Sequence, residues 1–326
     1  MVRTRRHILK GAAVAAGTVL FAPAAPGQSQ FPSRTVRIVV PFPAGATTDL
    51  LARLIANRLS DSMKQSFVVE NVGGGGSIGA DQVAKAAPDG HTLLFHNITF
   101  STTTSSLLFA KRARHDFDDF VPVSVGAYVP LLLLANNSVP ANDLKEFVAY
   151  AKTTTTPLFY GSTGPGSILH LIGEVLKRDA GIKMDHVPYR GAAPLVTDLI
   201  AGRVQFGGDQ LSSSLERVRS GQMKALGVAT KSVALPNVPT ARDLGFPNLE
   251  LQGWNGFLAP KGTPEPVIAR LQQEIAAAVK SPEVQKRMTD VGAEPSGSTQ
   301  AEMGEMLRRQ VAQIRPVVEE LKLLVE

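Results

Sequence analysis

Two segments of the sequence combine small residues, hydroxyl side chains and an expected helix start in a way that can bind an anion. The first, residues 40–59, reads VPFPAGATTDLLARLIANRL. Its apolar start predicts a strand ending near Phe42, and apolar residues at helical spacing predict a helix from about Thr47. The first N–H groups of a helix have no partner inside it, and the helix dipole adds partial positive charge there. A ligand carboxylate can therefore bind at this end.

The residues between this strand and helix fit the close approach of a ligand, although an ordinary helix cap explains them too. Ala44, Gly45 and Ala46 are small enough to leave the backbone accessible, and Thr48 can cap the helix or donate its hydroxyl group. Asp49 competes for the same N–H groups, so we expect it to act more as a cap than as a ligand contact. Taken alone, this turn is better explained as a capped strand-to-helix turn.

A second segment repeats the pattern more than a hundred residues later. Residues 158–176 read LFYGSTGPGSILHLIGEVL, where an apolar strand again leads through small and hydroxyl residues into an amphipathic helix. Ser162, Thr163, Gly164 and Ser167 occupy the turn. If the two helix ends belong to two domains that face one cleft, the natural ligand is a small molecule with two carboxylates.

A glycine cluster, NVGGGGSIGADQVAKAA, matches two catalytic or cofactor motifs by spacing alone. Gly74, Gly76 and Gly79 have the spacing of a dinucleotide-binding turn, but the next strand ends at Asn97 without the acid that would hold a ribose. Ser77 fits a nucleophile elbow, yet four consecutive glycines make a longer and looser turn than an elbow needs. A structural loop beside the cleft is the better interpretation of this cluster.

The remaining chemistry-bearing residues indicate no catalytic residue, no metal site and no cofactor. The sequence contains no cysteine, which excludes disulfides, thiolate ligands and cysteine nucleophiles. The histidines outside the first 30 residues show no metal-ligand spacing: they are His91, His96, His115, His170 and His186. We expect them to be surface or capping residues.

Short apolar runs and helical patterns alternate along most of the 326 residues. Expected strands cover 35–42, 66–72, 91–97, 121–129, 130–136, 158–162, 185–189, 203–209, 224–230 and 255–260. Helices are expected between them, and the last third predicts packing helices that carry no motif. Strands that alternate with helices are typical of an α/β fold with mostly parallel sheets flanked by helices.

The first 27 residues have the features of a cleaved secretory signal peptide. A basic start precedes an apolar run from Ala12 to Ala22, followed by small residues. Arg5 and Arg6 resemble a twin-arginine signal, and a general secretory route also fits. Cleavage would remove four positive charges and no acid, so the formal net charge of +6 would fall to +2. The remaining basic residues form no cluster, and we expect no nucleic-acid partner.

Five segments in this order resemble the Bug-type receptors, the periplasmic substrate-binding components of tripartite tricarboxylate transporters. They read VPFPAGATTD, VVENVGGGGSIGADQVAKAAPDGHTLL, YGSTGPGSILHL, HVPYRGAAPLVTDLIAGRVQFGGD and LPNVPTARDLGFPNLELQGWNGFLAPKGTP. The resemblance covers nearly the whole chain after the signal. It implies a two-lobed periplasmic binding protein of type II-like architecture, in which two crossing strands join the lobes.

Carried onto this sequence, the resemblance implies a first lobe of residues 31–128 plus 256–326 and a second lobe of residues 129–255. Residues 129–136 and 255–260 would form the crossing strands. It also implies a small carboxylate ligand, membrane subunits of a secondary transporter as partners, and a monomer. The candidate ligand-binding residues are Phe42, Ala44, Gly45, Ala46, Thr48, Asp49, Asn97, Ser162, Thr163, Gly164, Ser167 and Asp209.

Departures from the family pattern leave the ligand open. Ala46 replaces a second glycine of the first loop, and Gln205 stands where the family has an acid. The hydroxyl-rich residues 96–106 place Thr99 and Ser101 beside the cleft or in an ordinary surface loop. The ligand can be a dicarboxylate, a tricarboxylate, an acidic amino acid or an aromatic acid. Alternative functions are an exported serine hydrolase that uses Ser77, or a ligand-sensing adaptor of a signalling system.

Overall fold

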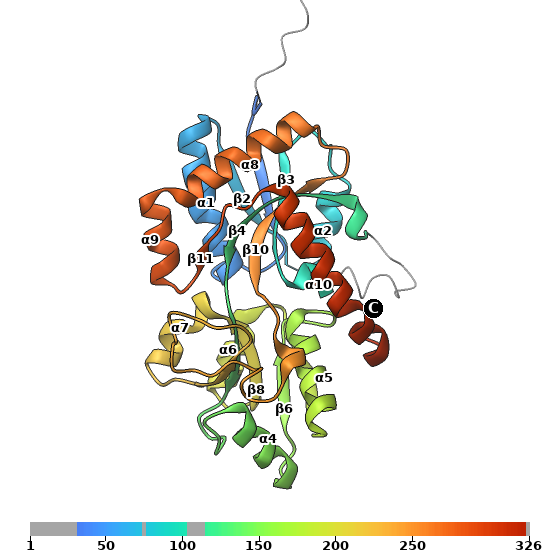
Figure 1. Ribbon diagram of the computed structural model, residues 1–326, viewed down its shortest axis with the longest axis vertical. Coiled ribbons are helices and arrows are strands. Elements are labelled where there is room, and N and C mark those ends of the chain that lie inside the picture. Colours follow the sequence, from blue (N-terminus) through green and yellow to red (C-terminus); the bar gives the residue numbers. More distant parts are fainter. Residues whose placement is uncertain (1–30, 74–75, 103–114, 324–326) are drawn as a thin grey trace, which may run out of the picture. The chain divides into compact units, whose positions relative to one another are not determined.

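The computed structural model describes residues 31–73, 76–102 and 115–323. The expected signal peptide, residues 1–27, therefore lies outside the described residues, as do Gly74 and Gly75 of the glycine cluster. From residue 32 onward the chain forms one compact unit with two sheets. We call the part around the six-stranded sheet the first lobe, and the part around the five-stranded sheet the second lobe (Figure 1).

The first sheet has the strand order β11-β4-β10-β3-β1-β2. Parallel pairing joins β1 to β2 and to β3, whereas β10 pairs antiparallel with both β3 and β4. Its strands are β1 (Val36–Val40), β2 (Phe67–Asn71), β3 (Thr92–Asn97), β4 (Phe120–Tyr128), β10 (Trp254–Pro260) and β11 (Glu294–Pro295). The β1 side chains at 36, 38, 39 and 40 are fully buried, because helices cover both faces of this central strand.

The second sheet has the order β7-β6-β8-β5-β9 and is also mixed. β6 runs parallel to β7 and β8, and β5 runs antiparallel to β8 and β9. Its strands are β5 (Leu131–Ala135), β6 (Phe159–Ser162), β7 (Asp185–Pro188), β8 (Phe206–Gln210) and β9 (Lys224–Val228). All five side chains of β5 are buried, in agreement with its uninterrupted run of leucines.

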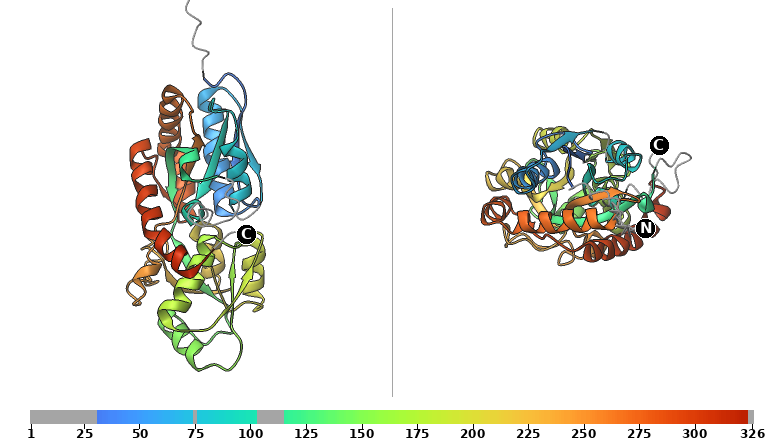
Figure 2. Two further views of the ribbon diagram at one scale, coloured as in Figure 1. Left: turned by 90° about the vertical axis from the view of Figure 1, so that its right-hand side faces the viewer. Right: turned by 90° about the horizontal axis from the view of Figure 1, so that it is seen from above.

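Helices flank both sheets. Figure 2 shows the C-terminal helices along one side of the first lobe and the β1–α1 region along the other. The last helix, α10, extends to the second lobe, where Arg178 forms a 2.7 Å ion pair with Glu320. The described helices are α1 (Thr47–Met63), α2 (Ser77–Ala84), α4 (Leu144–Thr153), α5 (Ile168–Ala180), α6 (Ala192–Ile200), α7 (Leu211–Arg219), α8 (Glu265–Lys280), α9 (Pro282–Asp290) and α10 (Gln300–Leu321).

The two-lobed α/β architecture predicted from the sequence is confirmed, while the sheets are mixed rather than mostly parallel. The physical reason lies in the crossings. β4 of the first sheet continues almost directly into β5 of the second, and the chain returns to the first sheet through β10. β5 and β10 enter their sheets in the direction opposite to their neighbours β8 and β3. The lobe boundaries at residues 128, 129, 255 and 256 stay a prediction.

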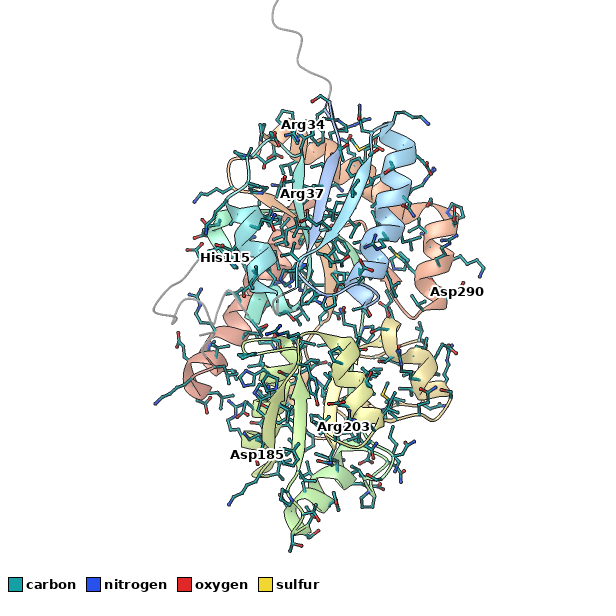
Figure 3. All side chains as sticks on the ribbon, turned by 180° about the vertical axis from the view of Figure 1, so that it is seen from behind. Arg34, Arg37, His115, Asp185, Arg203 and Asp290 are labelled. Carbon is teal, nitrogen blue, oxygen red and sulfur yellow. The ribbon has the colours of Figure 1, made fainter. Side chains whose placement is uncertain are left out.

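Among the described residues, no helix is long and apolar enough to cross a bilayer. Charged side chains lie on the outside of both lobes. Arg34, at the end of the first lobe farthest from the second lobe, pairs with Asp89, and Arg203 pairs with Asp198 in the second lobe (Figure 3). These exposed pairs contribute little to stability, so buried apolar packing is the main support of each lobe.

Candidate functional site

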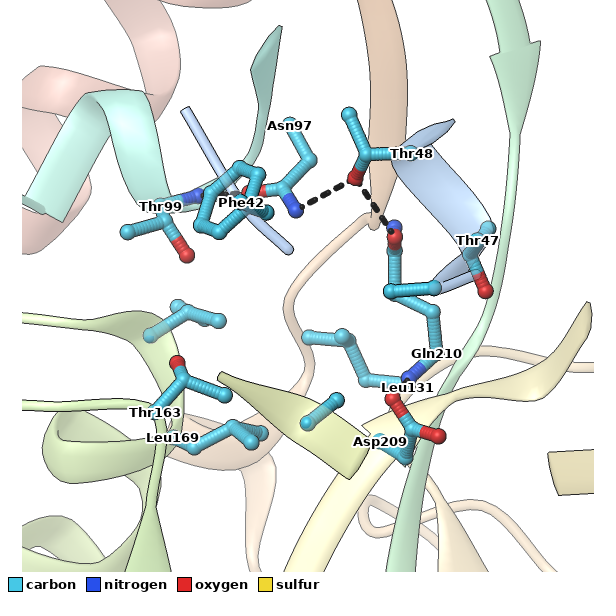
Figure 4. Close-up of a pocket in the computed structure, with 13 residues that line it drawn as sticks. Phe42, Thr47, Thr48, Asn97, Thr99, Leu131, Thr163, Leu169, Asp209 and Gln210 are labelled. Carbon is cyan, nitrogen blue, oxygen red and sulfur yellow. Dashed lines mark hydrogen bonds between the residues drawn. The ribbon is translucent and has the colours of Figure 1, made fainter. Parts of the chain in front are cut away.

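A small cavity of about 40 Å³ lies where the two lobes meet. Figure 4 shows the Thr48 hydroxyl between the Asn97 amide of its own lobe and the Gln210 amide of the second lobe. The lining residues are Phe42, Ala46, Thr47, Thr48, Asn97, Thr99 and Leu131, together with Thr163, Ile168, Leu169, Ala192, Asp209 and Gln210.

Four helices begin at this cavity. Thr47 is the first residue of α1, and Ile168 is the first residue of α5; both line the cavity. Ala192 is the first residue of α6, and Gln210 caps α7. The partly positive ends of one helix from the first lobe and three from the second therefore converge here. The described lining contains no lysine, arginine or histidine, so helix ends and neutral donors supply its positive potential.

The turn of the first lobe is held by Asp49. Its buried carboxylate accepts hydrogen bonds from the Gly45 N–H at 2.9 Å, from Arg53 at 3.0 Å and from the Asn71 amide at 2.9 Å. Burial alone would raise the pKa of Asp49, but these hydrogen bonds outweigh it and lower the pKa. The carboxylate is thus used in shaping the turn, although the expected cap is not found, because no side chain caps the start of α1 by a hydrogen bond.

The hydroxyls of Thr47 and Thr48 point instead across the cavity. Thr47 donates to the Ser213 hydroxyl of the second lobe at 3.0 Å. Thr48 accepts from the Asn97 amide at 2.9 Å, and its own hydroxyl lies 3.5 Å from Gln210 Oε1, at the limit of a hydrogen bond. These contacts join the start of α1 to the start of α7 (Figure 4).

Among the described residues that line the cavity, Asp209 is the one with a carboxylate side chain. Only 5% of the residue is exposed, and its oxygens accept from the hydroxyls of Ser213 and Ser214, both at 2.6 Å, and from the Gln210 N–H at 2.8 Å. Burial raises the pKa of Asp209, and the three hydrogen bonds oppose that rise. Asp209 therefore fixes the start of α7 and has its oxygens committed within its own lobe.

The turn of the second lobe, residues 162–167, is held by neutral groups. The fully buried Ser162 hydroxyl shares a 2.6 Å hydrogen bond with His186 Nε2 and accepts from the Gly164 N–H at 3.1 Å. Ser167 caps α5 by accepting from the His170 N–H, and the ring Nδ1 of His170 accepts from the Gly166 N–H at 3.1 Å. Glycine suits positions 164 and 166 because both have positive φ.

Three aromatic rings stack behind this second turn. The rings of His170 and His186 are 4.2 Å apart and nearly parallel, and His186 also stacks on Tyr160 at 4.9 Å. The Tyr160 hydroxyl donates to Glu174 at 2.6 Å. Burial, and secondly the neighbouring His170, lower the pKa of His186 to about 4, and burial also lowers the pKa of His170. Both imidazoles are therefore neutral near pH 7.

The structure brings the predicted residues of both turns to one place. Six of them line the cavity: Phe42, Ala46, Thr48, Asn97, Thr163 and Asp209. The other six belong to the same turns just outside the lining: Ala44, Gly45, Asp49, Ser162, Gly164 and Ser167. Thr99 lines the cavity, whereas Ser101 lies outside the lining and donates to Gln310 in the interior. Ligand contact by any of these residues stays a prediction.

Sequence reasoning missed the contributions of α6 and α7, and with them Ala192 and Gln210. It also missed the apolar wall formed by Leu131, Ile168 and Leu169. The signal for the two helices was present, because the segments YRGAAP and FGGDQLSSS repeat the sequence of strand, small residues and helix start. The expectation of surface histidines is wrong for His91, His96 and His115, which are all buried, and burial lowers the pKa of His96 to about 3.

The structure does not support the dinucleotide-binding turn or the nucleophile elbow as interpretations of the glycine cluster. Ser77 is the first residue of α2 and lies outside the cavity lining. Gly79 packs against β1, because a Cβ at this position would lie 2.8 Å from Pro41 Cβ. Among the described residues no group of three or more histidine, aspartate or glutamate side chains could hold a metal ion.

The sequence model of the tripartite tricarboxylate transporter family receptor matches residues 51–323. The chain belongs to this family. Among solved structures, it is 33% identical to the periplasmic binding protein BugD, with a TM-score of 0.83 over 91% of this chain and all of that one. These matches confirm the Bug-type resemblance drawn from the sequence motifs.

Two further solved structures carry ligands. An R. palustris protein with adipate is 35% identical, covering 90% of this chain and 99% of that chain, with a TM-score of 0.83. MatC from Rhodopseudomonas palustris with bound malate is 34% identical, covering 88% of this chain and all of that chain, with a TM-score of 0.82.

Proposed function

We propose that this receptor captures a small aliphatic carboxylate between its lobes in the periplasm and delivers it to the membrane subunits of a secondary transporter. The observation that carries this proposal is the convergence of four helix N-termini, from both lobes, on one cavity without cationic side chains in its described lining. Such helix ends favour anions. The adipate and malate bound by two structural relatives fit the same chemistry.

The lining also supports an aliphatic rather than a strongly polar ligand body. Phe42, Leu131, Ile168 and Leu169 supply apolar surface between the polar helix starts. A chain of methylene groups can be buried against these side chains while carboxylates at its ends meet N–H groups and hydroxyls. We therefore favour dicarboxylates over aromatic acids as the ligands of this cavity.

A calorimetric and thermal-shift comparison tests the proposal. The purified receptor is titrated with adipate and malate, with the matching mono-acids, and with the diamide of adipate, which keeps the shape but removes both charges. A cognate diacid should stabilise the protein by about 2.7 kcal/mol at a hundredfold excess over its Kd. The diamide should give no shift. Equal shifts with diacid and diamide, or none with any acid, would contradict carboxylate capture.

We further propose that the ligand is released unchanged. Ser162 has a histidine partner, but its hydroxyl is fully buried, and Ser77 lies outside the cavity lining. Ligand recovered after long incubation should therefore show no turnover. Ester hydrolysis that disappears in Ser77→Ala would instead establish the hydrolase alternative.

Export and partner choice complete the proposal. Cleavage between about Ala24 and Gln30 should appear in the intact mass of exported protein, and a mature protein that retains Met1 would contradict it. Arg5→Lys with Arg6→Lys should separate the twin-arginine route from the general secretory route.

The oligomeric state and the partner are tested separately. Size-exclusion chromatography should give a monomer. Capture by transporter membrane subunits, rather than by a sensor protein, would separate the transport role from a signalling adaptor.

A further inference from the structure

The side-chain amide of Gln210 is the unusual polar group of the site. Gln210 ends β8 and caps α7, and its side chain extends from the second lobe toward Thr48 in the first (Figure 4). Only 7% of the residue is exposed. Its Nε2 is buried and makes no hydrogen bond to any residue that the structure describes. A buried donor without a partner is costly, and in a native structure it calls for a functional explanation.

The orientation of this amide is only weakly fixed. Among the described residues, its one hydrogen bond is between Oε1 and the Thr48 hydroxyl, at 3.5 Å. Thr48 already accepts a 2.9 Å hydrogen bond from Asn97, so the Thr48–Asn97 pair persists if the glutamine amide turns. A small rotation can therefore direct Nε2 toward a ligand oxygen in the cavity that Gln210 lines.

The carboxylate of Asp209 and the amide oxygen of Asn97 in the lining are, by contrast, already engaged. The Asp209 oxygens accept three hydrogen bonds from its own lobe, and Asn97 Oδ1 accepts from the Thr99 N–H at 2.9 Å. A ligand ammonium group would need an acceptor, preferably a carboxylate. It would also lie near the partly positive ends of four helices. The described lining therefore offers an unpaired donor to a ligand oxygen, whereas its one carboxylate, Asp209, already accepts three hydrogen bonds and is poorly placed to pair with an ammonium.

We propose that Gln210 is a specificity-determining residue that donates from Nε2 to an oxygen of the bound acid. It thereby selects plain dicarboxylates over amino diacids of the same length. This inference rests on the proposed carboxylate-binding function and narrows its substrate class. It removes the acidic amino acids from the ligands that the sequence left open.

Matched ligand pairs and isosteric variants test this assignment. Calorimetry is performed with succinate and aspartate, and with glutarate and glutamate, because the members of each pair differ by one ammonium group. The wild type should bind each plain diacid about tenfold or more tightly than its amino counterpart. Gln210→Glu replaces the donor by a carboxylate of the same shape. It should weaken the diacids about tenfold or more and shift the preference toward the amino diacids.

Two further variants distinguish the loss of the proposed Gln210 hydrogen bond from the effect of an added charge and from an effect on folding. Gln210→Met removes the donor without adding charge, so it should weaken both members of a pair while the unliganded melting temperature stays the same or rises. Gln313→Glu introduces the same charge change at an exposed position of α10, outside the cavity. This variant should bind ligands like the wild type.

Two outcomes would overturn the role of Gln210: wild-type binding of the amino diacids as tightly as the plain diacids, or unchanged diacid affinity in both Gln210 variants. Failure of the wild type to bind any acid would instead overturn the proposed function.

Discussion

The turn before α1 and the turn before α5 look alike in sequence, but they are held in different ways. Residues 43–49 are fixed by an ionised carboxylate, Asp49, which pairs with Arg53. Residues 162–167 are fixed by uncharged groups, chiefly the Ser162–His186 and Gly166–His170 hydrogen bonds. A charged support stays in place over a wide pH range, whereas a neutral imidazole loses its acceptor nitrogen when it binds a proton.

The two turns also differ in where their contacts lead. The first turn reaches the opposite lobe through Thr47 and Ser213, and its Pro43 lies against Gly191 of the second lobe. The second turn is tied mainly to β7 and α5 of its own lobe. The first turn is therefore a contact surface for closure, and the second is a self-supporting binding loop.

The largest effect is expected from removing the charged support. Asp49→Ala leaves the Gly45 N–H, Arg53 and Asn71 without their shared acceptor. We expect a loss of about 2–3 kcal/mol in the free energy of unfolding, measured by urea denaturation. Arg53→Ala should cost less than about 1 kcal/mol, because that side chain is half exposed. Equal losses in the two variants would show that Asp49 acts only through its ion pair.

The next effect tests the closure surface directly. A Cβ at Gly191 would lie 2.7 Å from Pro43 Cγ, so Gly191→Ala should obstruct the closed arrangement and weaken ligand binding about tenfold. Gly181→Ala is the control in the same lobe. Gly181 also has positive φ, but an added Cβ there meets no atom within 4 Å. Calorimetry should show normal affinity for Gly181→Ala, and similar losses in both variants would point to backbone strain alone.

The neutral support predicts sensitivity to acid. His186, with a folded-state pKa of about 4, and His96, at about 3, bind protons more readily in the unfolded chain, where histidine titrates near pH 6.5. The stability that they contribute is complete above about pH 6.5 and falls as the pH drops toward 4. Melting temperatures should therefore decline over this window, while ligand affinity stays nearly flat from pH 6 to 8. His186→Gln should reduce the decline, and an unchanged profile would contradict the role of this imidazole.

Much of the fold follows from local sequence patterns. The runs at residues 36–40, where Arg37 is the one polar residue, and 131–135 predict buried strands because nearly all their side chains are apolar. The mixed pairing of the sheets could not be read in the same way. Pairing direction depends on how the chain crosses between lobes, and a buried strand has the same apolar pattern in either direction.

The site was predictable only in part, for a related reason. Small residues and hydroxyls before a helix mark a turn locally, so Thr48 and Thr163 could be selected from the sequence. Contacts between distant segments leave no local pattern. Thr47 and Ser213 are separated by 166 positions, and the Nε2 of Gln210, which has no partner among the described residues, becomes evident only when its surroundings are known.

The smallest expected effect concerns the hydrogen bond between the lobes. Thr47 donates to Ser213 at 3.0 Å, and Ser213 in turn donates to the buried carboxylate of Asp209. Thr47→Val keeps the shape and removes the hydroxyl, so its effect on ligand affinity reports mainly on this bond. We expect a weakening that corresponds to about 0.5–1 kcal/mol, since a neutral hydrogen bond contributes little more than that.

A double-mutant cycle with Ser213→Ala separates this bond from the other interactions of each residue. If the contact forms only when the lobes close, the two substitutions should be non-additive for ligand affinity by about 0.5 kcal/mol or more, yet additive for the unfolding of the unliganded protein. Additive effects on affinity would mean that the Thr47–Ser213 interaction does not strengthen when the ligand binds. The first turn would then contribute to closure through Pro43 and Thr48 alone, and the contrast with the self-supporting second turn would be correspondingly smaller.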